Sequence, residues 1–289
     1  MEQPTLTGAQ ILMQSLVDEG VETLFGYPGG AIMPVYDALY DYRDRLNHVL
    51  VRHEQGAAHA AEGYARASGR VGVCLVTSGP GATNTITGIA DAMMDSTPIV
   101  VITGQVPAQM LGTDAFQECD VVDITQPICK WAYQIRSAED VAWAVSRAFY
   151  IARSGRPGPV VLDFAKNAQV SRAVYQPQQT DFIRSYIPVP KTDKMSVVQA
   201  AAMINEAKRP LVLVGQGVEL GDACEELRAF IEKADMPAGC TLLGLSALPS
   251  DHPLNGLAEL AVDLLGQHAG GGNGELIALT AHGLHQDGK

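Results

Sequence analysis

The chain has 289 residues, of which 47% are hydrophobic and 18% charged, and its formal net charge is −12. This length and apolar content suffice for one large domain or two ordinary ones, while the acidic balance argues against nucleic acid as the main partner, because phosphate binding needs a clustered basic surface. Apolar runs such as 98–102 are too short to span a bilayer, and the start of the chain lacks the basic and apolar segments of a secretory signal.

The cysteines indicate a cytosolic protein. They are five in number, scattered, and without a Cys-x-x-Cys pair. An odd, dispersed set is typical of reduced thiols in a cytosolic protein. We therefore expect a cytoplasmic protein without a membrane segment.

Short β-branched runs alternate with longer amphipathic segments along the first part of the chain. This alternation is typical of a parallel sheet covered by helices. We predict helices over 7–19, 31–42, 54–68 and 138–152, with a further helix ending at Met94, and strands over 21–25, 47–51, 71–77, 99–104, 131–135 and 160–164.

The first domain is predicted to span residues 1–172, followed by a Gln-, Tyr- and Pro-containing linker over 173–194. A second α/β unit, with helices over 196–207 and 223–234 and strands over 211–214 and 238–242, covers 195–255. It is only the start of a doubly wound domain, because such a sheet needs more strands to bury both faces. Residues 256–289 are atypical: a helix over 257–265 and a short strand over 276–280 fit the pattern, but no continuation of the sheet is expected.

Glu54 is the first candidate for chemistry. It follows the predicted strand 47–51 at the point where a helix begins, and ligands of parallel α/β sheets bind at this carboxyl edge. A carboxylate there, beside the small residues Gly56 and Ala57, can be partly desolvated and suited to share a proton. The alternative is a first-turn glutamate that stabilises the helix dipole.

Three glycine-containing loops follow strands and should line the same edge. They cover 26–30, 78–81 and 104–107, and glycine lets a backbone approach a ligand closely. Each alone is more often a tight turn, but three at one edge beside a carboxylate favour a pocket. None is a Walker A loop or a G-x-G-x-x-G motif, which disfavours nucleotide binding.

Longer motifs around these residues resemble one enzyme family. The segments 25–30, 52–58, 77–84 and 112–118, together with Ser154-Gly155-Arg156-Pro157-Gly158-Pro159, resemble the acetohydroxyacid (acetolactate) synthase large subunit. The likeness runs from about Leu6 to Asn255. The motifs around Glu54 and Gly79 are shared with many pyruvate-type thiamine-diphosphate enzymes. The segments 113–118 and 154–159 resemble the acetohydroxyacid synthases more specifically.

The resemblance implies an α/β fold: a parallel-sheet thiamine-diphosphate pyrimidine-binding domain followed by the start of a Rossmann-like middle domain. Glu54 would hydrogen-bond a ring nitrogen of the cofactor's aminopyrimidine and favour its imino tautomer, and the cofactor itself would carry the carbanion chemistry. The implied reaction condenses two pyruvates, or pyruvate with 2-ketobutyrate, with loss of carbon dioxide, in branched-chain amino-acid biosynthesis. The substrates are therefore small 2-keto acids.

Further residues carry over from the family's motifs. Gln117 matches a polar residue that reaches into the active site, and Phe116 would pack beside it. Arg156 matches a residue that contacts FAD, and Lys166 matches a lysine near the substrate entrance, although Ala165 and Asn167 stand where the family usually has Pro and Asp. The loop beside the cofactor would consist of Tyr27, Gly29, Gly30 and Ala31.

No metal site built by this chain is expected, because its histidines show no metal-ligand spacing. In the family, Mg²⁺ is held by a third, C-terminal domain whose Gly-Asp-Gly motif we do not find. We therefore expect the chain alone to bind thiamine diphosphate weakly and to form little acetolactate, and one hypothesis for residues 256–289 is translation out of frame.

Several alternatives stay open on the sequence. One alternative is that the chain is a non-catalytic truncated pseudoenzyme. The other is that it is a different thiamine-diphosphate enzyme, such as a pyruvate oxidase or glyoxylate carboligase. Glu54 counts against the carboligase, which lacks that carboxylate, and the segment 113–118 counts against the oxidase. The resemblance implies a homodimer or larger assembly, and a small regulatory subunit is common in the family.

Overall fold

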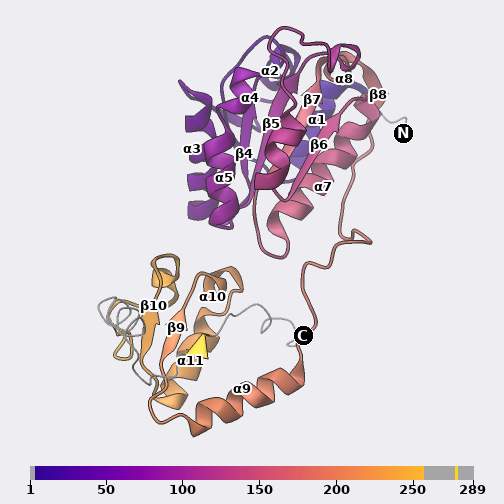
Figure 1. Cartoon of the computed structure of the whole chain (residues 1–289). Coiled ribbons are helices and arrows are strands. Elements are labelled where there is room, and N and C mark those ends of the chain that lie inside the picture. Colours follow the sequence, from indigo (N-terminus) through magenta and orange to yellow (C-terminus); the bar gives the residue numbers. More distant parts are fainter. Residues whose placement is uncertain (1–3, 257–276, 279–289) are drawn as a thin grey trace. The chain divides into compact units, whose positions relative to one another are not determined.

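The computed structural model describes residues 4–256 and 277–278 and divides into two compact units, Met1–Pro188 and Val189–Lys289 (Figure 1). Each unit is described by itself. The helix predicted over 257–265 lies outside the described residues.

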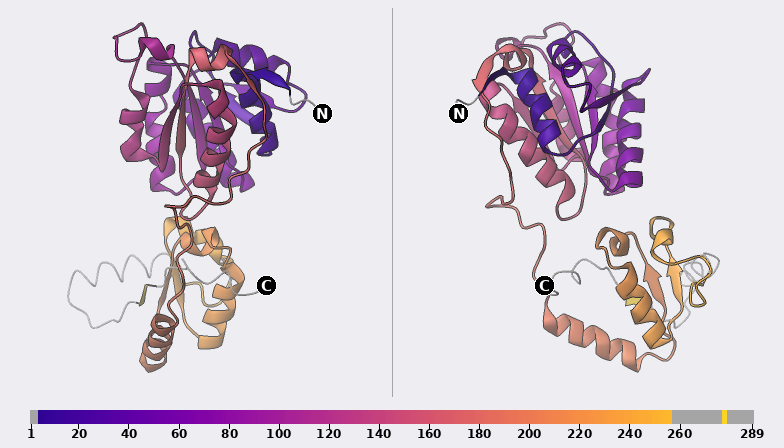
Figure 2. Two further views of the ribbon diagram at one scale, coloured as in Figure 1. Left: turned by 90° about the vertical axis from the view of Figure 1, so that its right-hand side faces the viewer. Right: turned by 180° about the vertical axis from the view of Figure 1, so that it is seen from behind.

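A six-stranded, fully parallel sheet forms the centre of the first unit. Its strand order is β3-β2-β4-β5-β7-β6, and the views in Figure 2 show helices packed against it. The parallel α/β fold predicted from the alternating sequence pattern is thereby confirmed. The strands are β2 (Thr23–Gly26), β3 (Asn47–Leu50), β4 (Gly72–Val76), β5 (Ile99–Gln105), β6 (Trp131–Ile135) and β7 (Val160–Ala165).

Helices cover both faces of this sheet. Buried residues of α1, α2 and α7 pack on one face, and those of α3, α5 and α6 pack on the other. The helices of this unit are α1 (Gly8–Asp18), α2 (Met33–Tyr40), α3 (Glu54–Ser68), α4 (Pro80–Thr83), α5 (Ile86–Met94), α6 (Val121–Thr125), α7 (Val141–Arg153) and α8 (Lys166–Val170), with 3₁₀ turns at Ala108–Met110, Gln126–Ile128 and Ala138–Asp140.

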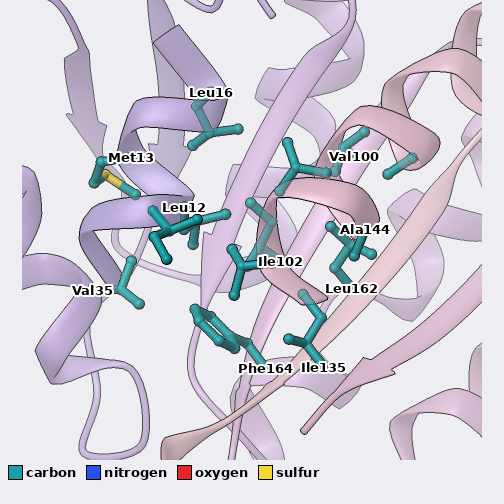
Figure 3. Close-up of a cluster of buried hydrophobic side chains, with 14 of the residues drawn as sticks. Leu12, Met13, Leu16, Val35, Val100, Ile102, Ile135, Ala144, Leu162 and Phe164 are labelled. Carbon is teal, nitrogen blue, oxygen red and sulfur yellow. The ribbon is translucent and has the colours of Figure 1, made fainter. Parts of the chain in front are cut away.

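Strand alternation explains why both faces are apolar. In β4, Val73 and Leu75 point into the core beneath α1 and α7, whereas Cys74 and Val76 point beneath α3 and α5. Figure 3 shows the first of these cores, where Leu12 of α1 lies near Ile102 of β5 and Phe164 of β7. Each of these large side chains is fully buried, and such burial contributes roughly 1.5–3 kcal/mol per side chain.

Local sequence signals fix several helix ends. Thr7 and Gln10 form a reciprocal capping box at the start of α1. Helix α3 begins at Glu54, where the His53 ring accepts a hydrogen bond from the Gln55 backbone N–H, and it ends at Gly69 in the left-handed conformation. The predicted bounds of α3 agree with the structure.

The structure also contains elements that the sequence pattern does not predict. Strand β1 (Thr5–Thr7) pairs antiparallel with β8 (Arg172–Val174), and the predicted helix ending at Met94 is broken into α4 and α5. No helix or strand is present from Tyr175 to Asp193. Within that stretch, Tyr186 accepts a hydrogen bond from the Lys130 ammonium at 3.1 Å.

The second unit contains a parallel sheet of order β10-β9-β11. Its described elements are α9 (Lys194–Glu206), β9 (Val212–Val214), α10 (Gly217–Leu220), α11 (Cys224–Ala234), β10 (Ala238–Cys240), a 3₁₀ turn over Leu242–Ala247, and β11 (Ile277–Ala278). The expectation that the sheet does not continue past residue 256 is wrong, because Ile277 pairs with Val212. Among the helices described here, none combines the length and apolar character needed to cross a membrane.

Candidate active site at the carboxyl edge of the first sheet

The strand order of the first sheet reverses between β2 and β4. The chain leaves β2 through α2 toward the outer strand β3, but leaves β4 through α5 toward β5 on the opposite side. The loops that follow β2 and β4 therefore diverge, and ligands of open α/β sheets bind at such a switch point. Glu54, which follows β3, lies against the loop after β4.

Glu54 is buried at this edge, with 9% of its surface exposed. Its Oε2 accepts a hydrogen bond from the Asn84 side-chain amide at 2.9 Å. Its Oε1 faces Gly81, where an added Cβ would lie 3.4 Å away. Because Asn84 engages only Oε2, Oε1 can still accept a hydrogen bond.

Thr77, the first residue after β4, connects the loops around Glu54. Its hydroxyl accepts a hydrogen bond from the Ala31 backbone N–H at 3.3 Å. A Cβ at Gly29 would lie 2.5 Å from its Cγ2, and one at Gly81 would lie 2.7 Å from the same atom. Side chains at these two positions would therefore displace Thr77, so glycine is required for this packing.

Gln117 reaches this edge through its backbone. Gly79 adopts a positive φ of 53°, and an added Cβ would lie 2.5 Å from the Gln117 carbonyl oxygen. Gln117 itself has a φ of 57°, a conformation uncommon for a residue with a side chain. The turn after β4 thus lies directly against the segment that carries Gln117.

Glu118 stabilises the turn 112–118, which carries Gln117, through its side chain. Its carboxylate accepts hydrogen bonds from the backbone N–H groups of Gly112 and Ala115. These bonds, led by the one from Gly112, lower the pKa of Glu118. An ionised Glu118 therefore stabilises the turn that precedes Gln117.

Two residues of α8 hold the loop that follows β2 at this edge. The Lys166 ammonium donates a hydrogen bond to the Gly30 carbonyl oxygen at 3.1 Å, and Gln169 donates one to the Ala31 carbonyl oxygen at 2.8 Å. A Cβ at Gly104 would lie 2.9 Å from that same Ala31 oxygen. The structure thus joins all three glycine-containing loops.

A polar network that was not predicted from the sequence lies just below the edge. Asp163 of β7 is fully buried and accepts hydrogen bonds from Thr103 at 2.8 Å and from the Gln105 and Gln134 amides at 3.1 and 2.9 Å. Burial raises the pKa of Asp163 to about 6, although these hydrogen bonds oppose the rise. The signal available in the sequence was a charged residue inside the apolar run 160–164.

Other predicted site residues are less closely tied to Glu54. Arg156 precedes β7 and donates hydrogen bonds to Ser96 and to the Met94 carbonyl oxygen, which precede β5, so it lies at the amino edge of the sheet. Phe116 is 86% exposed and Tyr27 is 39% exposed. An open hollow of about 400 Å³ lies between α2 and β3 rather than over Glu54.

One cluster within the described part of the chain has metal-ligand chemistry. Ligand atoms of His59, Glu62 and Asp91 lie within 4.8 Å of one another. The buried Glu62 also forms an ion pair with Arg66 at 2.8 Å, so the cluster is accounted for as an ion-pair network between α3 and α5.

Comparison with known families agrees with this geometry. Residues 6–124, which include Glu54 and Gln117, match the thiamine pyrophosphate enzyme N-terminal TPP binding domain. Residues 197–268 match the thiamine pyrophosphate enzyme central domain, a match that runs past Asn255, where the sequence analysis places the end of the likeness. The chain belongs to the thiamine pyrophosphate enzymes.

Within that family, the chain is similar to acetolactate synthase large subunits. It is 44% identical over 268 residues to that of Lactococcus lactis subsp. lactis, which covers 93% of this chain and 45% of the relative. It is 49% identical over 248 residues to the isozyme 2 large subunit of Escherichia coli K12, covering 86% of this chain and 44% of the relative. The chain thus spans a little under half the length of the curated relatives it matches.

Proposed function

We propose that the chain carries the pyrimidine-binding part of an acetolactate synthase large subunit, which condenses two pyruvates, or pyruvate with 2-ketobutyrate, with loss of carbon dioxide. Similarity to acetolactate synthase large subunits at 44–49% identity supports this assignment. The observation that carries it is the buried Glu54 carboxylate at the switch point of the sheet, held by Asn84 through one oxygen only.

The chemistry of this edge fits the aminopyrimidine of thiamine diphosphate. A buried carboxylate with one oxygen available is an acceptor for a protonated ring nitrogen, and in a poorly solvated site such a charge-assisted hydrogen bond is strong. Thiamine diphosphate supplies the carbanion chemistry when bound. Glu54 is the catalytic residue of this part of the site, and its role is to hold the proton at that ring nitrogen.

Neighbouring residues are proposed to line the cofactor and the substrate. Tyr27, Gly29, Gly30 and Ala31 form the loop beside the cofactor, and the hydrogen bonds that Ala31 donates to Thr77 and accepts from Gln169 support a fixed loop. Gln117 and Phe116 face the 2-keto acid, with Lys166 near its entrance. The hydrogen bond from Lys166 to Gly30 brings Lys166 to the loop beside the cofactor and supports its assignment.

The remaining cofactors and partners are proposed from the family alone. FAD would contact Arg156, and Mg²⁺ would anchor the diphosphate outside this chain's own residues. We propose a homodimer or larger assembly, with a small regulatory subunit as a further partner, in cytoplasmic branched-chain amino-acid biosynthesis.

Product analysis tests the proposal. The purified chain is given pyruvate, thiamine diphosphate, Mg²⁺ and FAD, with and without 2-ketobutyrate, and the products are separated by chromatography. The expected products are acetolactate and acetohydroxybutyrate, in the small amounts expected of a chain that binds thiamine diphosphate weakly, and both are lost in Glu54→Gln. Absence of any Glu54-dependent product would overturn the proposal in favour of a non-catalytic chain, and acetyl phosphate or acetate would point to an oxidase.

A further inference from the structure

The segment 107–120, which carries Phe116 and Gln117, is held near both of its ends, by a residue of α8 and by a residue of β5. Near its start, the Ala108 backbone N–H donates to the Asn167 side-chain oxygen at 2.8 Å. Near its end, the Cys119 carbonyl oxygen accepts a hydrogen bond from the Gln105 side-chain amide at 2.8 Å. Gln117 lies two residues from this second attachment.

Both the nitrogen and the oxygen of the Gln105 amide are engaged in hydrogen bonds. Its nitrogen donates both to Cys119 and to the Asp163 carboxylate, and its oxygen accepts from the Val106 backbone N–H at 2.8 Å. An amide can exchange the places of its nitrogen and oxygen by rotation, so the acceptor at Asp163 decides which end faces which neighbour. An ionised carboxylate accepts only, and it therefore keeps the nitrogen directed toward Asp163 and Cys119.

The sheet register places these residues in one row. Asp163 is the direct cross-strand neighbour of Thr103 on β5 and of Gln134 on β6, while Gln105 stands two residues beyond Thr103 on the same side. The row is buried in the described structure, with Asp163, Thr103 and Gln105 at zero exposure. Loss of one acceptor from such a buried network leaves a donor unpaired and costs folding free energy, so the network favours a single arrangement of its side chains.

We propose that Asp163 is a positioning residue for Gln117: it orients the Gln105 amide, which holds the end of the segment 107–120 through Cys119. This inference deepens the proposed function, since it rests on Gln117 facing the substrate. Asp163 itself touches no substrate or cofactor in this account. Its effect reaches the site through one amide and one backbone carbonyl.

Hydrogen–deuterium exchange of the full chain tests the proposal without requiring turnover. Asp163→Asn replaces a carboxylate, which only accepts hydrogen bonds, with an amide. The NH₂ group of that amide is a donor and must face one of Thr103, Gln105 and Gln134. We expect peptides covering 107–120 to exchange on the order of tenfold faster, which corresponds to losing one hydrogen bond to a charged group, while peptides of α1 and α7 are unchanged. Gln105→Met, which removes the connecting amide at similar volume, should give the same result.

Thr103→Val provides the matched control. It removes a different hydrogen bond to Asp163 from the same buried row but leaves the Gln105 bond to Cys119 in place. It should leave the exchange of 107–120 within about twofold of the unsubstituted chain. Unchanged exchange in both Asp163→Asn and Gln105→Met, or equal acceleration in Thr103→Val, would overturn the proposal.

Kinetics then separate this role from a general loss of packing. If the chain forms acetolactate, Asp163→Asn should alter kcat or KM in the same direction as Gln117→Ala, and the double variant should be no worse than Gln117→Ala alone. Additive losses would contradict positioning through Gln117. Failure of the proposed function would appear as absent turnover with the exchange result intact, so the two are distinguishable.

Discussion

Replacing Asp163 with asparagine is expected to remove a pH-dependent loss of stability from the first unit. The Asp163 carboxyl is fully buried, with a pKa of about 6 in the folded chain against an ordinary value of 3.8. Between these two values the unfolded chain is ionised at this position while the folded chain keeps its proton. Stability from this group is therefore fully present below pH 3.8 and is lost as the pH rises through about 6.

The size of the effect follows from the two pKa values. A difference of one between folded and unfolded pKa is worth about 1.4 kcal/mol, so the full effect of Asp163 on the free energy of unfolding is about 3 kcal/mol. Roughly 2 kcal/mol of it falls between pH 4 and pH 7, because the unfolded carboxyl is already partly ionised at pH 4. Burial is the main cause, and the nearby charge of Asp120 adds to it. Titrations of groups shared by both proteins, such as Glu19 with its raised pKa, cancel when the two curves are compared.

Urea unfolding followed by tryptophan fluorescence measures this difference. The two tryptophans of the chain, Trp131 and Trp143, both belong to the first unit, so the signal reports that unit even though a two-unit chain need not unfold in one step. The difference in the free energy of unfolding between the unsubstituted chain and Asp163→Asn should change by roughly 2 kcal/mol from pH 4 to pH 7. The curve of Asp123→Asn, at an exposed position on α6, should run parallel to that of the unsubstituted chain. Parallel curves for Asp163→Asn would refute the reasoning.

Three other predictions use the same unfolding assay. Gly79→Ala and Gly81→Ala should each lower the stability of the first unit by about 1–3 kcal/mol, because the added Cβ meets the Gln117 carbonyl or Thr77. Gly30→Ala, with open space at its Cβ position, should cost less than about 0.5 kcal/mol. Equal losses at all three positions would contradict the packing described. Asn84→Ala should cost about 1–3 kcal/mol at neutral pH, since it leaves a buried Glu54 oxygen without its donor, and an unchanged midpoint would show that this bond is not formed. Lys130→Met should lower the stability by about 1–2 kcal/mol, because the ammonium donates to the Ile151 and Ser154 carbonyl oxygens and to Tyr186. The same variant should be cleaved faster by a protease within 175–193. Unaltered cleavage there would contradict the docking of Tyr186.

Much of the first unit could be predicted because its signals are local. The strand runs, the capping residue Thr7 and the terminal Gly69 each act within a few residues of where they stand, and the predicted strands and α3 agree with the structure. The pairing of β1 with β8 could not be predicted in this way, because it joins residues about 165 positions apart and depends on the completed fold. Strand β11 pairs with β9 by the same kind of distant contact.

The candidate site was partly visible in the sequence. Glu54 and the three glycine-containing loops follow strands, and parallel topology alone brings strand ends to one edge. Thr77 and Asn84 stand inside the family motif 77–84, but their contacts with Gly29 and Glu54 depend on how separate loops fold against one another. The link from Asp163 through Gln105 to Cys119 depends on side-chain direction across β5 and β7, which a strand pattern does not specify.

Calorimetric titration of thiamine diphosphate with Mg²⁺ into the purified chain tests the central claim, that Glu54 holds the cofactor's aminopyrimidine. Glu54→Gln should weaken binding by about 10- to 100-fold, the effect of losing a hydrogen bond to a charged group. Glu62→Gln is the matched control, because Glu62 is a second buried glutamate on the same helix but is engaged by Arg66, and it should keep the affinity within about twofold once folding is verified. Unchanged affinity in Glu54→Gln, or an equal loss in Glu62→Gln, would contradict the account.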